Sequence, residues 1–199
     1  MSKKSMLLAY ATRFGSTQEV AETITSVLCE SGIEVELQPM QEVQSLDGYD
    51  AVVLGAALYN TCWHQDAHQF LAKHQNNLGQ RPVAIFALGP LNTSGAAMRN
   101  SRRQLDKELA KYAWLKPVAV EMFAGKYDPS KPGLSFFERL MPARDYRDWV
   151  AIRAWANTLP AQLEHVRERL QADYPNNSNT VALAAQVVTN NSLEKEKNG

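Results

Sequence analysis

A hydroxyl-rich loop near the start of the chain carries the clearest chemistry in the sequence. A short apolar segment, residues 5–10, leads into this loop, and an amphipathic segment, residues 17–30, follows it. The loop consists of Thr12, Arg13, Phe14, Gly15, Ser16 and Thr17. Backbone N–H groups at a helix N-terminus attract an anion, and the three hydroxyls can donate to the same anion. The spacing predicts a phosphate site, although an ordinary strand–helix turn with a Ser or Thr cap also fits it.

The absence of two common motifs indicates which class of phosphate-containing ligand the loop could bind. The loop is neither the G-x-G-x-x-G of dinucleotide-binding proteins nor the G-x-x-x-x-G-K-[ST] of nucleoside triphosphatases. A cradle of neutral donors without a lysine suits a single phosphate ester. Gly15 allows the backbone to approach that ligand closely or to adopt a positive φ.

Composition excludes several other classes of protein. The chain has 199 residues, of which 45% are hydrophobic and 21% charged, and its formal net charge is zero. A neutral chain argues against nucleic acid as the main partner and against a strongly acidic electron shuttle. The two cysteines, Cys29 and Cys62, imply no disulfide framework, so we expect a cytoplasmic protein. No apolar run reaches the ~18–20 residues of a membrane span, and the apolar N-terminal run is better explained as a strand than as a signal sequence.

Strand and helix patterns alternate along the chain, which is typical of an α/β fold. Strands are expected at 5–10, 33–38, 51–57, 83–88 and 117–123, and helices at 17–30, 64–75, 95–112 and 147–171. We expect a doubly wound, five-stranded parallel sheet in the order 2-1-3-4-5, with helices on both faces. Pro160 is expected to kink or break the last helix. Residues 1–173 would form this domain and residues 174–199 a flexible C-terminal tail.

Two further loops are expected at the same edge of the sheet, next to the hydroxyl-rich loop. The second loop supplies Leu58, Tyr59 and Trp63, and the third supplies Gly89, Pro90, Leu91 and Asn92. Aromatic rings beside small residues suit a flat ligand that needs an apolar wall and backbone hydrogen bonds at its edge. Alternatively, Tyr59 and Trp63 merely close the end of the sheet and pack on the following helix.

The second loop also carries weaker signals. Cys62 lies close in sequence to His64 and His68, so a thiol–imidazole pair or a two-histidine metal site can be imagined. No third metal ligand accompanies the two histidines. We therefore expect solvated surface histidines and no metal site.

A long segment, residues 124–147, separates the last strand from the last helix. Its apolar residues Leu134, Phe137, Leu140 and Met141 share helical spacing, and Phe136 is adjacent. Three arginines, Arg139, Arg144 and Arg147, lie among them. Long loops are often functional, so this segment could cover the ligand, bind an acidic apolar substrate or rest on a membrane. A short helix packed on the domain is the competing interpretation.

The motifs together resemble a known family. Leu8-x-Tyr10-x-Thr12-x-x-Gly15-x-Thr17-x-x-x-Ala21-x-x-Ile24 is similar to the flavodoxin signature for the phosphate of FMN, departing from it at Ala9, where a larger residue is usual. Gly55-x-Ala57-x-Tyr59-x-x-x-Trp63, Gly89-Pro90-Leu91, Phe123-Ala124-Gly125-x-x-Asp128 and Asp145-Tyr146-Arg147-Asp148-Trp149-x-x-Ile152-x-x-Trp155-Ala156 follow in order. They resemble the flavodoxin branch that includes menaquinone-dependent protoporphyrinogen dehydrogenases.

The resemblance implies a cofactor and a division of roles. FMN would be held through its phosphate by residues 12–17, flanked by Tyr59 and Trp63 and bordered by residues 89–92. The activity implied is an oxidoreductase that passes hydrogens from a small-molecule substrate through FMN to a quinone. A soluble electron carrier that docks a redox protein, and a non-redox module with a vestigial site, remain alternatives. Residues 134–147 would provide peripheral contact with the inner face of the membrane, and no catalytic acid or base is assigned.

Overall fold

The computed structural model describes residues 5–59 and 62–173. The chain divides into one compact unit, Met1–Arg167, and a second unit, Glu168–Gly199. The predicted tail, 174–199, lies outside the described residues, as do residues 60–61 of the second loop.

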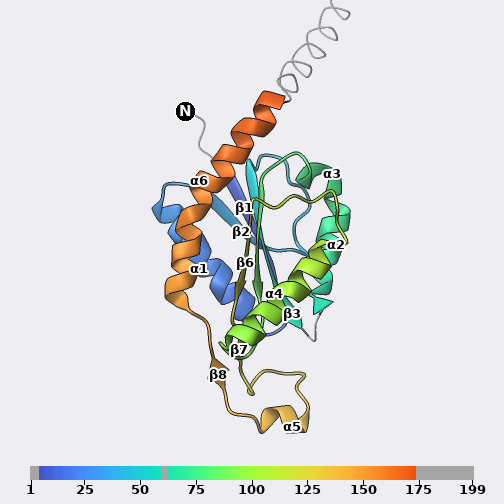
Figure 1. The fold of residues 1–199 in the computed structure, drawn as a ribbon, viewed down its shortest axis with the longest axis vertical. Coiled ribbons are helices and arrows are strands. Elements are labelled where there is room, and N and C mark those ends of the chain that lie inside the picture. Colours follow the sequence, from blue (N-terminus) through green and yellow to red (C-terminus); the bar gives the residue numbers. More distant parts are fainter. Residues whose placement is uncertain (1–4, 60–61, 174–199) are drawn as a thin grey trace, which may run out of the picture. The chain divides into compact units, whose positions relative to one another are not determined.

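A parallel sheet forms the centre of the first unit (Figure 1). Its strands are β1 (Ser5–Ala11), β2 (Glu34–Pro39), β3 (Ala51–Tyr59), β5 (Val83–Leu88) and β6 (Ala119–Phe123), in the order β2-β1-β3-β5-β6. A two-residue strand, β4 (Cys62–Trp63), pairs antiparallel with the end of β3. Apart from β4, this is the predicted 2-1-3-4-5 order, and the doubly wound α/β fold is confirmed.

Helices cover both faces of this sheet, as Figure 1 shows. One face carries α1 (Ser16–Glu30) and the first turns of α6 (Trp149–Asp173), and the other carries α2 (Gln65–Lys73), α3 (Gln75–Leu78) and α4 (Gly95–Leu109). Successive residues of β1 point to opposite faces, so Leu8 packs in the first layer and Leu7 in the second. Both faces of the central strands are therefore buried, and this explains why their sequences are continuously apolar and do not alternate with polar residues.

The observed helices differ from the predicted ones in two details. Helix α6 continues through Pro160 without a break, because Ala156, Leu159 and Leu163 hold the turns on either side against the sheet. The helix expected at 64–75 ends at Lys73, and a separate turn, α3, follows the buried His74. Tertiary packing decides both outcomes, and the helix propensities of the individual residues do not contain this information.

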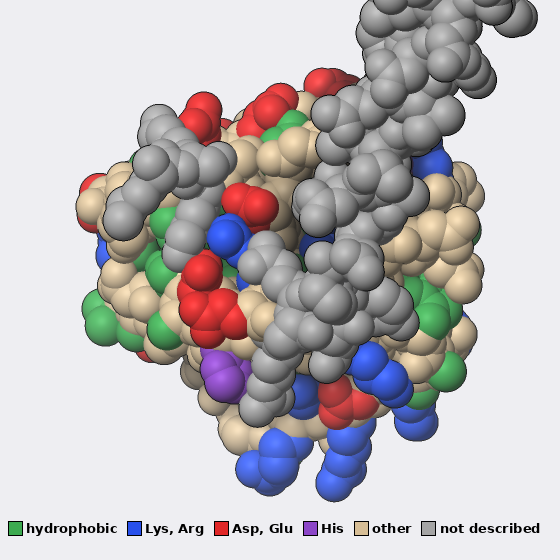
Figure 2. All heavy atoms as spheres, turned by 90° about the horizontal axis from the view of Figure 1, so that it is seen from above, with side chains coloured by type: hydrophobic (Ala, Val, Ile, Leu, Met, Phe, Trp, Pro, Cys, Tyr) green, Lys and Arg blue, Asp and Glu red, His purple; other side chains and the backbone are tan. Residues whose placement is uncertain are grey.

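An excursion of the chain lies beyond the carboxyl end of β6, at the bottom of Figure 1. We call residues 126–145 the insertion; it contains β7 (Lys126–Tyr127), α5 (Phe136–Arg139) and β8 (Arg144–Asp145). Strands β7 and β8 pair antiparallel, so the two ends of the insertion lie side by side. Figure 2 looks down from the top of Figure 1, and there acidic and basic side chains lie next to one another on the visible surface. Across 5–59 and 62–173, no helix combines the length and hydropathy needed to cross a membrane.

Candidate functional site

The hydroxyl-rich loop joins the carboxyl end of β1 to the start of α1. Gly15, at the N-cap of α1, has φ of 90°, a conformation that glycine adopts without steric cost. The Gly15 N–H donates to Thr12 Oγ1 at 2.9 Å, so Thr12 shapes the loop itself. Among the described residues, no side chain forms a capping hydrogen bond at the start of α1. The first N–H groups of a helix have no intrahelical acceptor, and here they are available to a ligand.

Thr17 provides the observation that points most directly to a ligand. Its side chain is fully buried, and its Oγ1 has no hydrogen-bond partner in the described structure. A buried hydroxyl without a partner costs about 1–3 kcal/mol, so a ligand atom that accepts its hydrogen would remove a real penalty. The donors of this loop fit a phosphate group.

Aromatic and cationic side chains join the first loop to the second. The rings of Phe14 and Tyr59 lie 6.1 Å apart. The Arg13 guanidinium lies 4.9 Å from the Phe14 centroid and 4.8 Å from that of Tyr59. Tyr59 keeps 37% of its surface exposed, and Leu58 beside it is half-buried. This pair of rings can form a wall for a flat ligand.

Trp63 lies in a different environment from Tyr59. Only 2% of it is exposed, and its ring packs edge-on against His68 with the centroids 5.9 Å apart. Trp63 therefore belongs to the core layer under α2 and α4. A flanking role for Trp63 remains a prediction, and the wall described here does not depend on it.

A polar cluster beside Trp63 was missed by the sequence reasoning. His68 Nδ1 lies 2.6 Å from the Tyr112 hydroxyl, and His68 Nε2 lies 3.0 Å from Glu108 Oε2. Lys111 pairs with the same carboxylate at 2.8 Å. His68 is thus a partnered side chain rather than the solvated histidine expected, while Cys62 is exposed. The spacing of Glu108, Lys111 and Tyr112 on and after α4 gave no signal of its own.

The third loop packs against the end of β6 and the residues that lead into the insertion. The Gly89 N–H donates to the Phe123 carbonyl at 2.8 Å, and the Gly125 N–H donates to the Pro90 carbonyl at 2.9 Å. Leu91 is 44% exposed, and Asn92 Oδ1 accepts from the Ser94 backbone and hydroxyl at 3.0 and 2.8 Å. Strands β1, β3 and β5 are parallel neighbours, so this loop lies at the same sheet edge as the first two.

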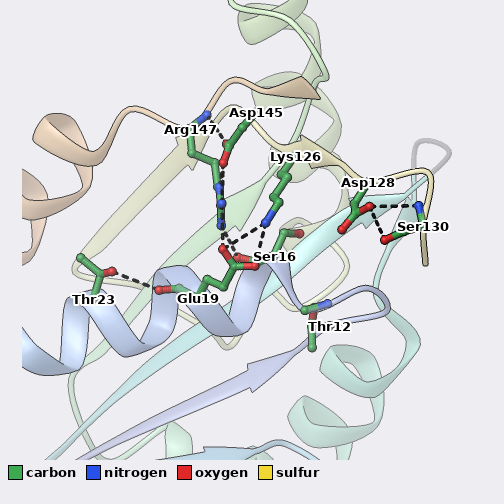
Figure 3. A network of polar contacts seen from close by, with 10 residues as sticks. Thr12, Ser16, Glu19, Thr23, Lys126, Asp128, Ser130, Asp145 and Arg147 are labelled. Atoms are coloured by element: carbon green, nitrogen blue, oxygen red, sulfur yellow. Dashed lines mark hydrogen bonds and ion pairs between the residues drawn. The ribbon is translucent and has the colours of Figure 1, made fainter. Parts of the chain in front are cut away.

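An ion-pair network ties the insertion to α1 (Figure 3). Glu19, in the first turn of α1, pairs with Lys126 at 3.0 Å and with Arg147 at 2.8 Å. Arg147 also binds Asp145 through two hydrogen bonds of 2.8 and 2.6 Å. Burial alone would raise the pKa of Glu19, but hydrogen bonds from Arg147 and Lys126 outweigh it and lower this pKa. The same arginine lowers the pKa of Asp145.

The network corrects the expectation of a continuous apolar and basic face on residues 134–147. The Arg147 side chain is only 2% exposed; it pairs with its two carboxylates, and its guanidinium lies 4.4 Å from the centroid of the Trp149 ring. Leu134 is also buried and, with Phe14 and Ser16, lines a small pocket beside the loop. The large hydrophobic residues of this segment that remain exposed are Phe136 (71%), Phe137 (80%), Leu140 (68%) and Met141 (52%). We call these four residues the apolar tip.

Comparisons with known proteins agree with this geometry. Protoporphyrinogen IX dehydrogenase [quinone] of Escherichia coli K12 is 30% identical over 84 residues, which cover 41% of this chain and 46% of that protein. The match thus spans about half the length of the curated relatives. Oxidised flavodoxin 1 of Bacillus cereus superposes with a TM-score of 0.52 at 15% identity, covering 81% of this chain and 98% of the flavodoxin. Flavodoxin 2 of the same organism gives 0.51 at 19% identity, covering 79% and 99%. At these identities the structures show the fold alone.

Family membership rests on the match to a family model, which covers more than half of the chain. The model of the flavodoxin domain family matches residues 7–143, which include the hydroxyl-rich loop, the second and third loops and most of the insertion. The sheet order and the position of the loops are those that the resemblance implied. The chain therefore belongs to the flavodoxin domain family.

Proposed function

We propose that the chain binds FMN non-covalently at the carboxyl edge of the sheet. The observation that supports this proposal best is Thr17 Oγ1, a fully buried hydroxyl without a partner at the start of α1. The phosphate would be held by residues 12–17, through the hydroxyls of Thr12, Ser16 and Thr17 and the first N–H groups of α1.

The remaining predicted residues would hold the ring. Tyr59 would face the isoalloxazine, with Phe14 and Arg13 supporting its ring. Gly89, Pro90 and Leu91 would border the edge of the flavin, where backbone groups can bond its polar atoms. When bound, FMN supplies the redox chemistry, and the protein holds it, orients it and excludes water.

Identification of the cofactor tests this proposal. The purified chain, reconstituted with a mixture of FMN, FAD and riboflavin and then desalted, should retain FMN. Acid release followed by chromatography identifies what is retained. Retention of FAD, or of no flavin at all, would contradict the proposal.

The oxidoreductase function is the finer part of the proposal. We infer that the chain oxidises a reduced small molecule of the porphyrinogen class and passes the hydrogens to a membrane quinone. Two observations support this: the partial relative is named a quinone-linked protoporphyrinogen IX dehydrogenase, and the apolar tip is exposed beside Arg139 and Arg144. An apolar surface flanked by cations suits an anionic bilayer, in which quinones dissolve.

A direct assay separates this function from that of an electron carrier. The FMN-loaded chain should oxidise protoporphyrinogen IX only when a quinone is present, and faster with the quinone in anionic vesicles than in detergent. If the chain exchanges electrons with a redox protein but neither oxidises protoporphyrinogen IX nor reduces the quinone, we would conclude that it is an electron carrier and not this enzyme.

A further inference from the structure

The insertion places a lysine next to the hydroxyl-rich loop. A Cβ built on Gly15 would lie 3.9 Å from Lys131 Nζ, and within the described chain no other heavy atom beyond the neighbouring residues comes within 4 Å of that point. Gly15 is the residue with a positive φ at the N-cap of α1. The ammonium group of Lys131 therefore stands beside the part of the loop that carries the phosphate donors.

Two other cations near the loop, Lys126 and Arg147, are already neutralised, and the guanidinium of a third, Arg13, lies against the rings of Phe14 and Tyr59. Lys126 and Arg147 share Glu19, and Arg147 also binds Asp145 (Figure 3), so two positive charges meet two negative ones. Within 5–59 and 62–173, no ion pair includes Lys131. Asp128 lies nearby in the chain, but its carboxylate accepts hydrogen bonds from the Ser130 backbone and hydroxyl at 3.0 and 2.6 Å. Those hydrogen bonds are the main cause that lowers the pKa of Asp128, and the charge of Lys131 adds less.

The insertion is held firmly enough to keep Lys131 at the loop. Pairing of β7 with β8 and the Glu19 network fix its base. Leu134, three residues beyond Lys131, is buried and lines the pocket that Phe14 and Ser16 share with Lys126 and Asp128. Lys131 thus lies on a segment anchored on both sides of it, and its side chain alone needs to move to meet a ligand.

We propose that Lys131 contacts the phosphate of the bound flavin and makes the site selective for FMN over riboflavin. This inference rests on the proposed FMN function. Apart from Arg13, whose guanidinium lies against the rings of Phe14 and Tyr59, the loop offers neutral donors, whereas a phosphate monoester carries about −1.5 to −2 charges at neutral pH. A charge-assisted hydrogen bond from an ammonium is about twice as strong as a neutral one. Lys131 would act only on the phosphate, because the ring binds at the second and third loops.

Flavin titrations of the apo-protein test the inference. FMN and riboflavin are each titrated into wild type, Lys131→Met, Lys131→Arg and the control Lys116→Met, by quenching of flavin fluorescence. Lys116 is exposed and precedes β6, so it lies at the amino ends of the parallel strands, whereas the loop lies at their carboxyl ends. We expect Lys131→Met to weaken FMN binding about tenfold or more at low ionic strength and to leave riboflavin binding unchanged.

Two accompanying results are expected if Lys131 meets the phosphate. Lys131→Arg should keep most of the FMN affinity, and the difference between wild type and Lys131→Met should shrink with added salt, because the contact is partly exposed. Lys116→Met should match wild type with both ligands. The melting temperatures of all apo-variants, measured in parallel, identify any variant that fails to fold.

The possible outcomes test the role of Lys131 separately from the proposal that the chain binds FMN. If Lys131→Met binds FMN as tightly as wild type, or loses FMN and riboflavin equally, the phosphate role of Lys131 is overturned while FMN binding stands. If wild type binds neither flavin, the FMN function fails, and the role of Lys131 fails with it.

Discussion

Arg147 and Glu19 form an ion pair whose two members differ sharply in exposure. Arg147 Nη2 lies 2.8 Å from Glu19 Oε2, and the arginine side chain is 2% exposed while the glutamate is 40% exposed. Asp145 is equally exposed and binds the same arginine. The carboxylates can recover water when the pair breaks, but the arginine cannot. The free-energy cost of breaking this network therefore comes mainly from leaving the buried Arg147 guanidinium without a partner.

Removing both carboxylates should destabilise the protein more than the two single changes predict. Glu19→Gln or Asp145→Asn leaves one acid on Arg147 and should each cost about 1 kcal/mol of unfolding free energy. The double variant leaves the buried cation unpaired and should cost about 3–5 kcal/mol. Urea unfolding of the three variants measures this coupling. Asp106→Asn, which removes an exposed pair with Arg102, should cost less than ~0.5 kcal/mol, and strict additivity of the network variants would contradict the prediction.

Acid should weaken the same network. The pKa values of Glu19 and Asp145 are lowered in the folded protein, so both groups bind protons more readily when the chain is unfolded. Their contribution is therefore complete above their unfolded pKa values, about 4, and is lost as the pH falls through the folded values. Unfolding free energies measured from pH 6 to pH 3 should fall less in Glu19→Gln than in wild type. Parallel curves for the two proteins would show that Glu19 does not contribute in this way.

Thr17→Val should act in opposite directions on stability and on cofactor binding. Without ligand, the change removes a buried hydroxyl that has no partner, so the apo-protein should be as stable as wild type or more stable. With FMN, it removes a hydrogen bond to a charged group, worth ~1.5–3 kcal/mol, and the dissociation constant should rise by about tenfold or more.

The same helix supplies a matched control for Thr17. Thr25 Oγ1 is also buried without a partner, but it lies about two turns further along α1. Thr25→Val should therefore alter apo stability in the same direction and leave FMN binding unchanged. An unaltered FMN affinity in Thr17→Val would place the phosphate away from this hydroxyl.

The apolar tip should matter for membrane contact and not for folding. Because Phe136 and Phe137 are 71% and 80% exposed, changing both to Ser should alter the unfolding free energy by no more than ~0.5 kcal/mol each. FMN should be retained, and co-sedimentation with anionic vesicles should fall. Leu134→Ser is the contrasting variant: Leu134 is buried, so its loss should cost about 2–5 kcal/mol. Vesicle binding that is equal in wild type and the double variant would exclude the tip as the membrane contact.

Local patterns were sufficient to predict the sheet and the position of the loops. Continuous apolar runs such as residues 51–57 and 83–88 are typical of central strands covered on both faces, and their alternation with helices fits the flavodoxin-like strand order. The turn at Gly15 is likewise a local property of the chain. Helix α6 shows the limit of such reasoning, since the packing of Leu159 and Leu163 outweighs the effect of Pro160.

Features that depend on distant partners were not predictable. Arg147 and the exposed Arg144 are each followed by an aspartate, but only Arg147 is buried, where it pairs with Glu19 on the first helix. The contact between His68 and Tyr112 joins residues 44 positions apart, and no periodicity reports it. Leu134 shares helical spacing with the tip, yet the closeness of Phe14 and Ser16 places it in the interior. In each case a charge or a cavity elsewhere in the fold decided the outcome.

The pairing of β7 with β8 has a consequence for how this domain can change over time or by engineering. The chain leaves the domain at Tyr127 and returns at Arg144, and these two residues are register partners. A loop whose ends are already held together can be lengthened, shortened or exchanged at a small cost in closure entropy. The stretch that carries the apolar tip could thus be replaced by one of different length or chemistry, provided that Leu134 keeps its buried place beside Phe14 and Ser16.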